Sequence, residues 1–251
     1  MEASNPPPEQ GTGAGKTAEK LVAKETEAAP PEASAGQPDG GARGADNRPL
    51  GFVLKGIDPS HPYLEGRGIA RETAEEFGVG FFPGKGSMRG RLVIPIHNEK
   101  GDLVAYAGRS IDDSELRYKL PAGFKKSLVL YNLHRALKSG ESGARVVIVE
   151  GFFDTMKVYQ AGFSCVVGLM GSSLSSAQEE LLVENFDQVV LMLDDDDAGR
   201  VATDDCLKRL ARRLFVRAIV LPDGKQPDML SAEEFEAILG GSKVQKGDNR
   251  E

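Results

Sequence analysis

The sequence predicts an α/β protein, with a small parallel sheet between helices and a preceding α+β unit. Continuous apolar runs at 146–149, 165–169 and 189–193 are each followed by a helix-like pattern, as in parallel strands that are buried on both faces. Earlier in the chain, two largely apolar segments flank a short polar turn, a pattern typical of an antiparallel hairpin. The hairpin and the later alternation of strands and helices therefore predict two different sheets.

The composition limits the classes of protein that fit. The chain has 251 residues, enough for a sizeable core, and its net charge of −7 argues against binding nucleic acid through overall basicity. Its two cysteines, Cys165 and Cys206, lie in apolar or helical patterns, which argues against a disulfide framework and excludes a multi-cysteine zinc module. No signal segment opens the chain, and no apolar run approaches the roughly 18 residues that span a bilayer. We therefore expect a cytoplasmic protein that binds no membrane.

The two ends of the chain differ in composition from the middle. Residues 1–48 are rich in Pro, Gly, Ala, Glu and Ser, and such a segment buries too little apolar surface to offset the entropy cost of ordering. The predicted organisation is a disordered low-complexity leader at 1–48, an α+β subdomain at 49–142, the parallel-sheet domain at 143–240 and a disordered tail at 241–251.

In the first unit, short helices are expected at 60–66 and 71–77, the second ended by Gly78 in a left-handed conformation. The hairpin strands are 91–97 and 103–109, and Pro95 favours a position near the edge for the first. A basic segment that contains a tyrosine follows, with Arg117, Tyr118, Lys119, Lys125 and Lys126. It suits phosphates and a stacked base; the alternative is an ordinary solvated loop.

In the second unit, a helix is expected at 152–161 and another from a capping box at Ser176–Glu179 to about residue 183. Further helices are expected at 198–214 and, capped by Ser231, up to Gly240. Residues 216–221 are expected to form a fourth buried strand.

Four consecutive aspartates, 194–197, follow the strand at 189–193. The carboxyl ends of parallel strands share one rim of the sheet, where ligands bind, so Glu150 is expected close to Asp194. In an extended chain Asp194 and Asp196 point to one side, and the other two aspartates to the opposite side. Converging carboxylates suit magnesium or manganese better than zinc. The alternative is an acidic loop that only caps the next helix.

Three blocks of the second unit, Glu150–Asp154, Leu169–Ser173 and Asp194–Arg200, resemble the signature blocks of the TOPRIM domain in bacterial DnaG-type DNA primases. Before them, four segments resemble the basic template- and nucleotide-binding blocks of the same RNA-polymerase core: 90–96, 105–109, 117–118 and 124–131. The resemblance implies a Rossmann-like TOPRIM sheet after a primase-type α+β N-terminal subdomain. It also implies synthesis of RNA primers on single-stranded DNA by two-metal nucleotidyl transfer.

The same resemblance implies the roles of site residues and the partners. Glu150, Asp194 and Asp196 would be catalytic, and with Asp154 and Asp228 they would hold Mg²⁺ or Mn²⁺, with no zinc. Template or nucleoside triphosphate would contact Arg91, Arg109, Arg117, Tyr118 and Lys126. The expected partners are single-stranded DNA and nucleoside triphosphates, together with a replicative helicase or a separate zinc-module protein.

The chain departs from the family at several points. It has too few cysteines for a zinc module, Asp195 replaces a small glycine, and Gln226 stands where another aspartate is common. The change at Gln226 predicts weak binding of one metal ion. Two alternatives therefore remain, a metal-dependent TOPRIM nuclease and a catalytically weakened module that binds DNA or a replication partner.

Overall fold

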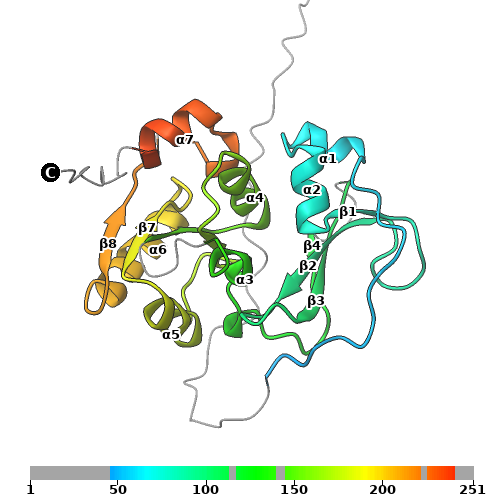
Figure 1. Ribbon diagram of the computed structural model, residues 1–251, viewed down its shortest axis with the longest axis horizontal. Helices are drawn as coiled ribbons and strands as arrows, with labels where there is room; N and C mark the ends of the chain where they lie inside the picture. Colours follow the sequence, from blue (N-terminus) through cyan, green and yellow to red (C-terminus); the bar gives the residue numbers. More distant parts are fainter. Residues whose placement is uncertain (1–45, 113–116, 140–144, 222–224, 241–251) are drawn as a thin grey trace, which may run out of the picture.

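The computed structural model describes residues 46–112, 117–139, 145–221 and 225–240. The tail and all but the last few residues of the predicted leader lie outside these ranges. Two four-stranded sheets lie side by side, one antiparallel and one parallel, and helices cover both (Figure 1). The predicted α/β fold class, with a preceding α+β unit, is confirmed.

The first sheet has the order β1-β2-β3-β4 and is antiparallel throughout. Its strands are β1 (Gly80–Phe82), β2 (Arg91–His97), β3 (Leu103–Arg109) and β4 (Tyr118–Lys119). Two short helices precede it, α1 (Pro62–Gly66) and α2 (Arg71–Phe77). Gly78 ends α2 at φ 67°, a left-handed conformation that glycine adopts without strain. The hairpin and both helices agree with the prediction from the sequence.

The expectation that Pro95 marks an edge strand was wrong. Strand β2 pairs with β1 on one side and with β3 on the other. However, β1 pairs only with Arg91–Val93, so the part of β2 that contains Pro95 has a strand neighbour on one side alone. Proline lacks an N–H donor and is tolerated where one side of a strand needs no partner.

The second sheet is parallel and has the order β6-β5-β7-β8. Its strands are β5 (Arg145–Val149), β6 (Val166–Gly168), β7 (Gln188–Leu191) and β8 (Phe215–Ala218). The helices around this sheet are α3 (Leu133–Ala136), α4 (Phe152–Gln160), α5 (Ser176–Asn185), α6 (Asp197–Leu210) and α7 (Ala232–Leu239), with 3-10 turns η1 (Lys126–Leu128) and η2 (Pro227–Met229). Strands β5 and β7 are central, so their carboxyl ends lie side by side.

Three details of the second unit differ from the sequence prediction. Strand β8 is an edge strand, and Phe215 at its start is 79% exposed, so it is not a fourth buried strand. The capping box of α5 uses Ser175 and Gln178, one residue earlier than predicted. Helix α6 ends at Leu210 and a turn replaces its predicted last residues.

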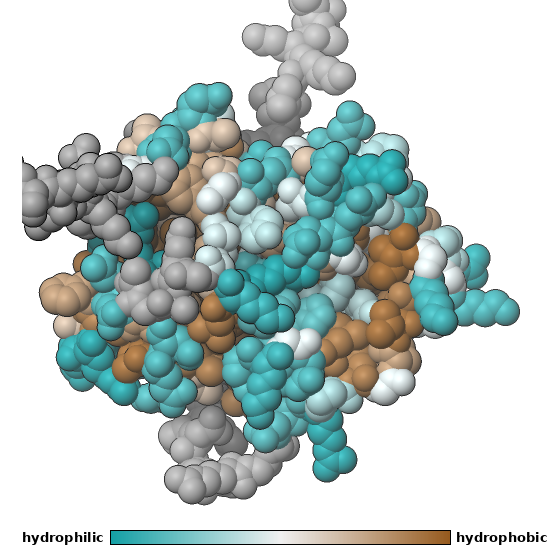
Figure 2. Space-filling model, in the orientation of Figure 1, coloured by the Kyte–Doolittle hydropathy of each residue, from teal (hydrophilic) through white to brown (hydrophobic). Residues whose placement is uncertain are grey.

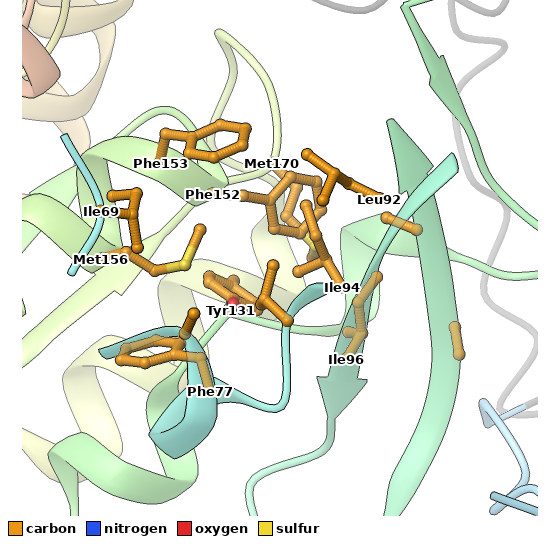
Figure 3. Close-up of a cluster of buried hydrophobic side chains, with 14 of the residues drawn as sticks. Ile69, Phe77, Leu92, Ile94, Ile96, Tyr131, Phe152, Phe153, Met156 and Met170 are labelled. Atoms are coloured by element: carbon orange, nitrogen blue, oxygen red, sulfur yellow. The ribbon is translucent and has the colours of Figure 1, made fainter. Parts of the chain in front are cut away.

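One hydrophobic cluster joins the two units. Figure 3 shows Phe77 of α2 and Ile94 of β2 packed towards Tyr131, Phe152 and Met170, which belong to the segment around the parallel sheet. Tyr131 also pairs with Gly168, so the chain between η1 and α3 packs on the second sheet although it precedes it in sequence. The basic segment is therefore fixed relative to the rim of the parallel sheet.

One face of the molecule is mostly polar (Figure 2). Figure 2 shows charged and polar side chains over most of one face, with smaller apolar areas among them. Among the described helices, none combines the length and the apolar character that crossing a bilayer requires.

Candidate active site

Glu150 and Asp194 meet at the carboxyl ends of the two central parallel strands. Glu150 directly follows β5, and one of its carboxylate oxygens, Oε1, accepts a hydrogen bond from the backbone N–H of Asp194 at 3.3 Å. Gly199 makes this approach possible, since a Cβ there would overlap the carbonyl oxygen of Asp194 and lie 3.1 Å from Glu150 Oε1. The side chain of Glu150 is buried, at 9% exposure. Two acidic residues 44 positions apart thus share one rim.

Among the four consecutive aspartates, two accept hydrogen bonds from N–H groups and two pair with an arginine. Asp196 caps α6, with Oδ1 accepting from the N–H of Gly199 at 2.8 Å. Asp194 Oδ2 accepts from the side-chain amide of Gln226 at 2.9 Å. Asp195 and Asp197 both pair with Arg200, at 3.0 and 2.7 Å.

These contacts stabilise the first turn of α6. The helix-cap interpretation holds for Asp196, and Arg200 braces the loop from the first turn of α6. The carboxylates of Asp197 and Asp195 raise the pKa of Arg200 through their hydrogen bonds.

Asp154 and Asp228 lie together on a neighbouring part of the rim. Asp154 accepts hydrogen bonds from two backbone N–H groups, that of Gly151 at 2.9 Å and that of Asp228 at 3.2 Å. Asp228 in turn forms an ion pair with Arg67 at 2.5 Å, and its side chain is only 7% exposed. The guanidinium of Arg67 lies 5.1 Å above the ring of Phe153. These internal partners neutralise or satisfy both carboxylates.

Arg67 is a residue that the sequence analysis missed. It caps the C-terminal end of α1 and lies 161 positions from Asp228. Its only local feature is a cation between two glycines, a pattern that carries no specific signal. Its place at the acidic rim depends on the packing of the two units.

The donor chemistry of the rim fits a hard divalent cation. Glu150, Asp194 and Asp196 offer carboxylate oxygens, which magnesium and manganese prefer, and the missing Cβ of Gly199 lets the carbonyl oxygen of Asp194 and the Glu150 carboxylate come close to α6. Within the described ranges no three His, Cys, Asp or Glu side chains are grouped closely enough to hold a metal ion by themselves. A site with few protein ligands suits an ion that keeps several of its water molecules.

Two of the predicted basic residues are buried in the first unit. Arg109, at 5% exposure, donates to the hydroxyls of Tyr63 at 2.6 Å and Tyr118 at 2.9 Å. Its guanidinium also lies 5.0 Å from the centre of the Tyr118 ring. Arg91, at 6% exposure, donates to the carbonyl oxygen of Gly108 at 3.3 Å. Both arginines therefore organise the sheet and the neighbouring aromatic residues.

The other predicted basic residues lie closer to the surface. Lys126 is half-buried, and its Nζ donates to the carbonyl oxygen of Met170 at 3.2 Å, in the loop after β6. Arg117 is also half-buried, and its carbonyl oxygen accepts from the N–H of Ser110. Lys125 is exposed, and its backbone N–H and carbonyl oxygen both bond to the side chain of Asn47. The basic segment is thus a fixed part of the surface.

The sequence matches two protein families. Residues 147–231 match the Toprim-like family, and residues 85–137 match the N-terminal domain of the DNA primase catalytic core. A DNA primase from Deinococcus radiodurans is 34% identical, and the match covers 73% of this chain and 40% of the relative. A DNA primase from Staphylococcus epidermidis is 33% identical, over 72% of this chain and 32% of the relative. The chain spans less than half the length of these curated relatives.

Solved structures agree with this assignment. A DnaG primase catalytic domain bound to ssDNA has a TM-score of 0.64 and 26% identity, and the match covers 73% of this chain and 71% of that one. The zinc-binding and RNA-polymerase domains of Aquifex aeolicus primase have a TM-score of 0.63 and 26% identity, over 72% of this chain and 55% of that one. In sequence and in fold, this chain belongs to the TOPRIM proteins that have a DnaG-type primase catalytic core.

Proposed function

We propose that this chain is the catalytic core of a primase that makes short RNA primers on single-stranded DNA. The contact between Glu150 and Asp194 carries the proposal, because it brings the Glu150 carboxylate to the backbone of Asp194 at the rim where ligands bind. The attachment of Lys126 to the loop after β6 keeps the basic segment near that rim. A related catalytic domain with bound ssDNA supports the choice of template.

Glu150, Asp194 and Asp196 would hold Mg²⁺ or Mn²⁺, with no zinc. Divalent ions held there would supply Lewis-acid stabilisation of the charge that develops during nucleotidyl transfer. Asp154 and Asp228 would complete the acidic rim, held in place by the backbone amides and by Arg67. Their role would be to shape the loop that carries Gln226.

The basic segment would bind the template and the incoming nucleoside triphosphate. Lys126 and Arg117 would pair with phosphates, and the ring of Tyr118 would stack on a base. Arg109 would hold that ring through its hydrogen bond and ring contact, and Arg91 would support the same sheet.

We place the division between the two units at about residue 142, and we expect activity in the cytoplasm with a helicase or a zinc-module protein as partner.

A primer-synthesis assay on single-stranded DNA, with ribonucleotides and Mn²⁺, tests the proposal. We expect Asp194→Ala and Glu150→Ala to reduce synthesis by at least about a hundredfold. The matched control is Asp204→Ala, which removes an exposed aspartate from α6 and should leave synthesis unchanged. Full synthesis by either site variant would refute the assigned mechanism.

The same proteins separate the two alternatives. Labelled DNA incubated with metal but without nucleotides would be shortened by a nuclease and left intact by a primase. DNA binding without either reaction would identify a binding module.

A further inference from the structure

The side chain of Gln226 lies directly against the proposed metal site. Its Nε2 donates to Asp194 Oδ2 at 2.9 Å, and Asp194 is one of the three carboxylates proposed to hold a cation. The amide must present its NH₂ group to this oxygen, because a carboxylate only accepts hydrogen bonds and the amide oxygen would repel it. The partial positive charge of the Gln226 NH₂ group therefore lies close to Asp194 Oδ2, the oxygen that a divalent ion would bind.

The backbone around Gln226 is held firmly. Two residues later, Asp228 is fixed by its backbone hydrogen bond to Asp154 and by its ion pair with Arg67. Just before it, Lys225 pairs with Glu234 of α7 at 2.5 Å. Pro227, which follows directly, is buried and starts the 3-10 turn η2. The amide of Gln226 is therefore delivered to Asp194 by a segment that is anchored on both sides.

We propose that Gln226 is a positioning residue that occupies the Asp194 carboxylate in the metal-free protein, so that a divalent ion must displace its amide to bind fully. The inference rests on the proposed function, since it assumes that Asp194 is a metal ligand. The amide stabilises an otherwise repulsive group of carboxylates without adding charge. The same hydrogen bond lowers the affinity for metal, because its loss is part of the cost of binding.

This competition predicts opposite effects on stability and on metal affinity. In Gln226→Leu, the metal-free protein should melt about 3 °C lower, because Asp194 loses a hydrogen-bond donor. The same variant should bind Mn²⁺ about fivefold more tightly, since no amide has to be displaced. A residue with a purely structural role would lower both quantities, and a residue that itself ligates the metal would lose affinity when replaced.

The isosteric variant Gln226→Glu adds a carboxylate at the same place. It should lower the melting temperature of the metal-free protein further and bind Mn²⁺ more than about tenfold more tightly, because an added negative charge repels Asp194 and attracts the ion. The matched control is Gln188→Glu, which adds the same charge at an exposed position at the opposite end of β7. The control should leave Mn²⁺ affinity close to that of the unchanged protein.

The experiment is a calorimetric titration of the 251-residue chain and each variant with Mn²⁺ alone, together with the melting temperature of each with and without Mn²⁺. Asp194→Ala is included to separate two kinds of failure. If the unchanged protein binds no Mn²⁺, or if Asp194→Ala binds it equally well, the proposed metal site is wrong. If Asp194→Ala abolishes binding while Gln226→Leu binds Mn²⁺ as the unchanged protein does, or more weakly, the role assigned to Gln226 is overturned.

Discussion

Lys126 donates a hydrogen bond from Nζ to the carbonyl oxygen of Met170 at 3.2 Å, and so joins the basic segment to the loop after β6. Nearby contacts reinforce this link. The hydroxyl of Ser175 donates to the carbonyl oxygen of Ser127 at 2.5 Å, and the buried amide of Gln178 donates to Val129 and Leu169. The capping box of α5 therefore also connects the basic segment to the parallel sheet.

Replacement of Ser175 should consequently affect both stability and DNA binding. In Ser175→Ala the helix loses its cap and the link to Ser127, with an expected loss of about 2 kcal/mol in unfolding free energy. Ser231→Ala removes the equivalent cap of α7, away from the basic segment, and should cost about 1 kcal/mol. Urea unfolding and ssDNA titrations of both variants check this. Equal DNA affinity in the two would contradict the linking role of Ser175.

Gly199 should not tolerate a side chain. In Gly199→Ala the new Cβ would overlap the carbonyl oxygen of Asp194 and press on Glu150 Oε1, so the start of α6 has to shift. We expect a loss of about 2 kcal/mol in stability and a larger relative loss of primer synthesis. Gly66→Ala is the control, because a Cβ added at Gly66 would have no other atoms within 4 Å. Unchanged synthesis in Gly199→Ala would show that the rim adapts.

The ion pair between Arg67 and Asp228 should stabilise the contact between the two units. Arg67→Met leaves the largely buried carboxylate of Asp228 without its cation, at an expected cost of about 2 kcal/mol. Adding Asp228→Asn should recover part of this loss, because the uncompensated charge is removed. Thermal unfolding of the two single variants and the double variant measures the coupling. Strictly additive effects would mean that the pair contributes no coupling energy.

His134 should make the protein less stable in acid. Burial, with Arg135 and His97 nearby, lowers the pKa of His134 to about 3. In the unfolded chain the pKa of a histidine is about 6.5. The unfolded chain therefore binds an extra proton as the pH falls below about 6.5, and stability decreases from there down to the folded pKa. Above about pH 6.5, His134 is neutral in both states and does not change the stability with pH.

Replacement of His134 tests this pH dependence. His134→Leu should weaken the decrease in the urea midpoint between about pH 7.5 and pH 5. The pKa of His97 is also lowered by burial, so part of the decrease should persist. Loss of the hydrogen bond to Arg135 lowers the urea midpoint of the variant at both pH values. The test therefore compares, between the two proteins, the difference between the midpoints at the two pH values. An identical change in both proteins would contradict the assignment.

The sequence by itself determined the elements and the shared rim. Continuous apolar runs identified the buried parallel strands, and strand direction placed Glu150 and Asp194 on the same rim, because parallel strands end at the same edge; the pairing of β5 with β7 made them neighbours. The alternation expected for the four aspartates stays a prediction, since α6 begins at Asp197 and helical spacing brings its carboxylate to Arg200. The strands and the shared rim follow from local periodicity, which the order of residues records directly.

Tertiary structure alone decided which distant side chains complete the rim. The contacts of Arg67 with Asp228 and of Gln226 with Asp194 join positions 161 and 32 residues apart. The position of β8 at the sheet edge was likewise set by the order of the strands. No local pattern encodes such contacts, because long polar side chains find their partners only after the apolar clusters have fixed the backbones relative to one another.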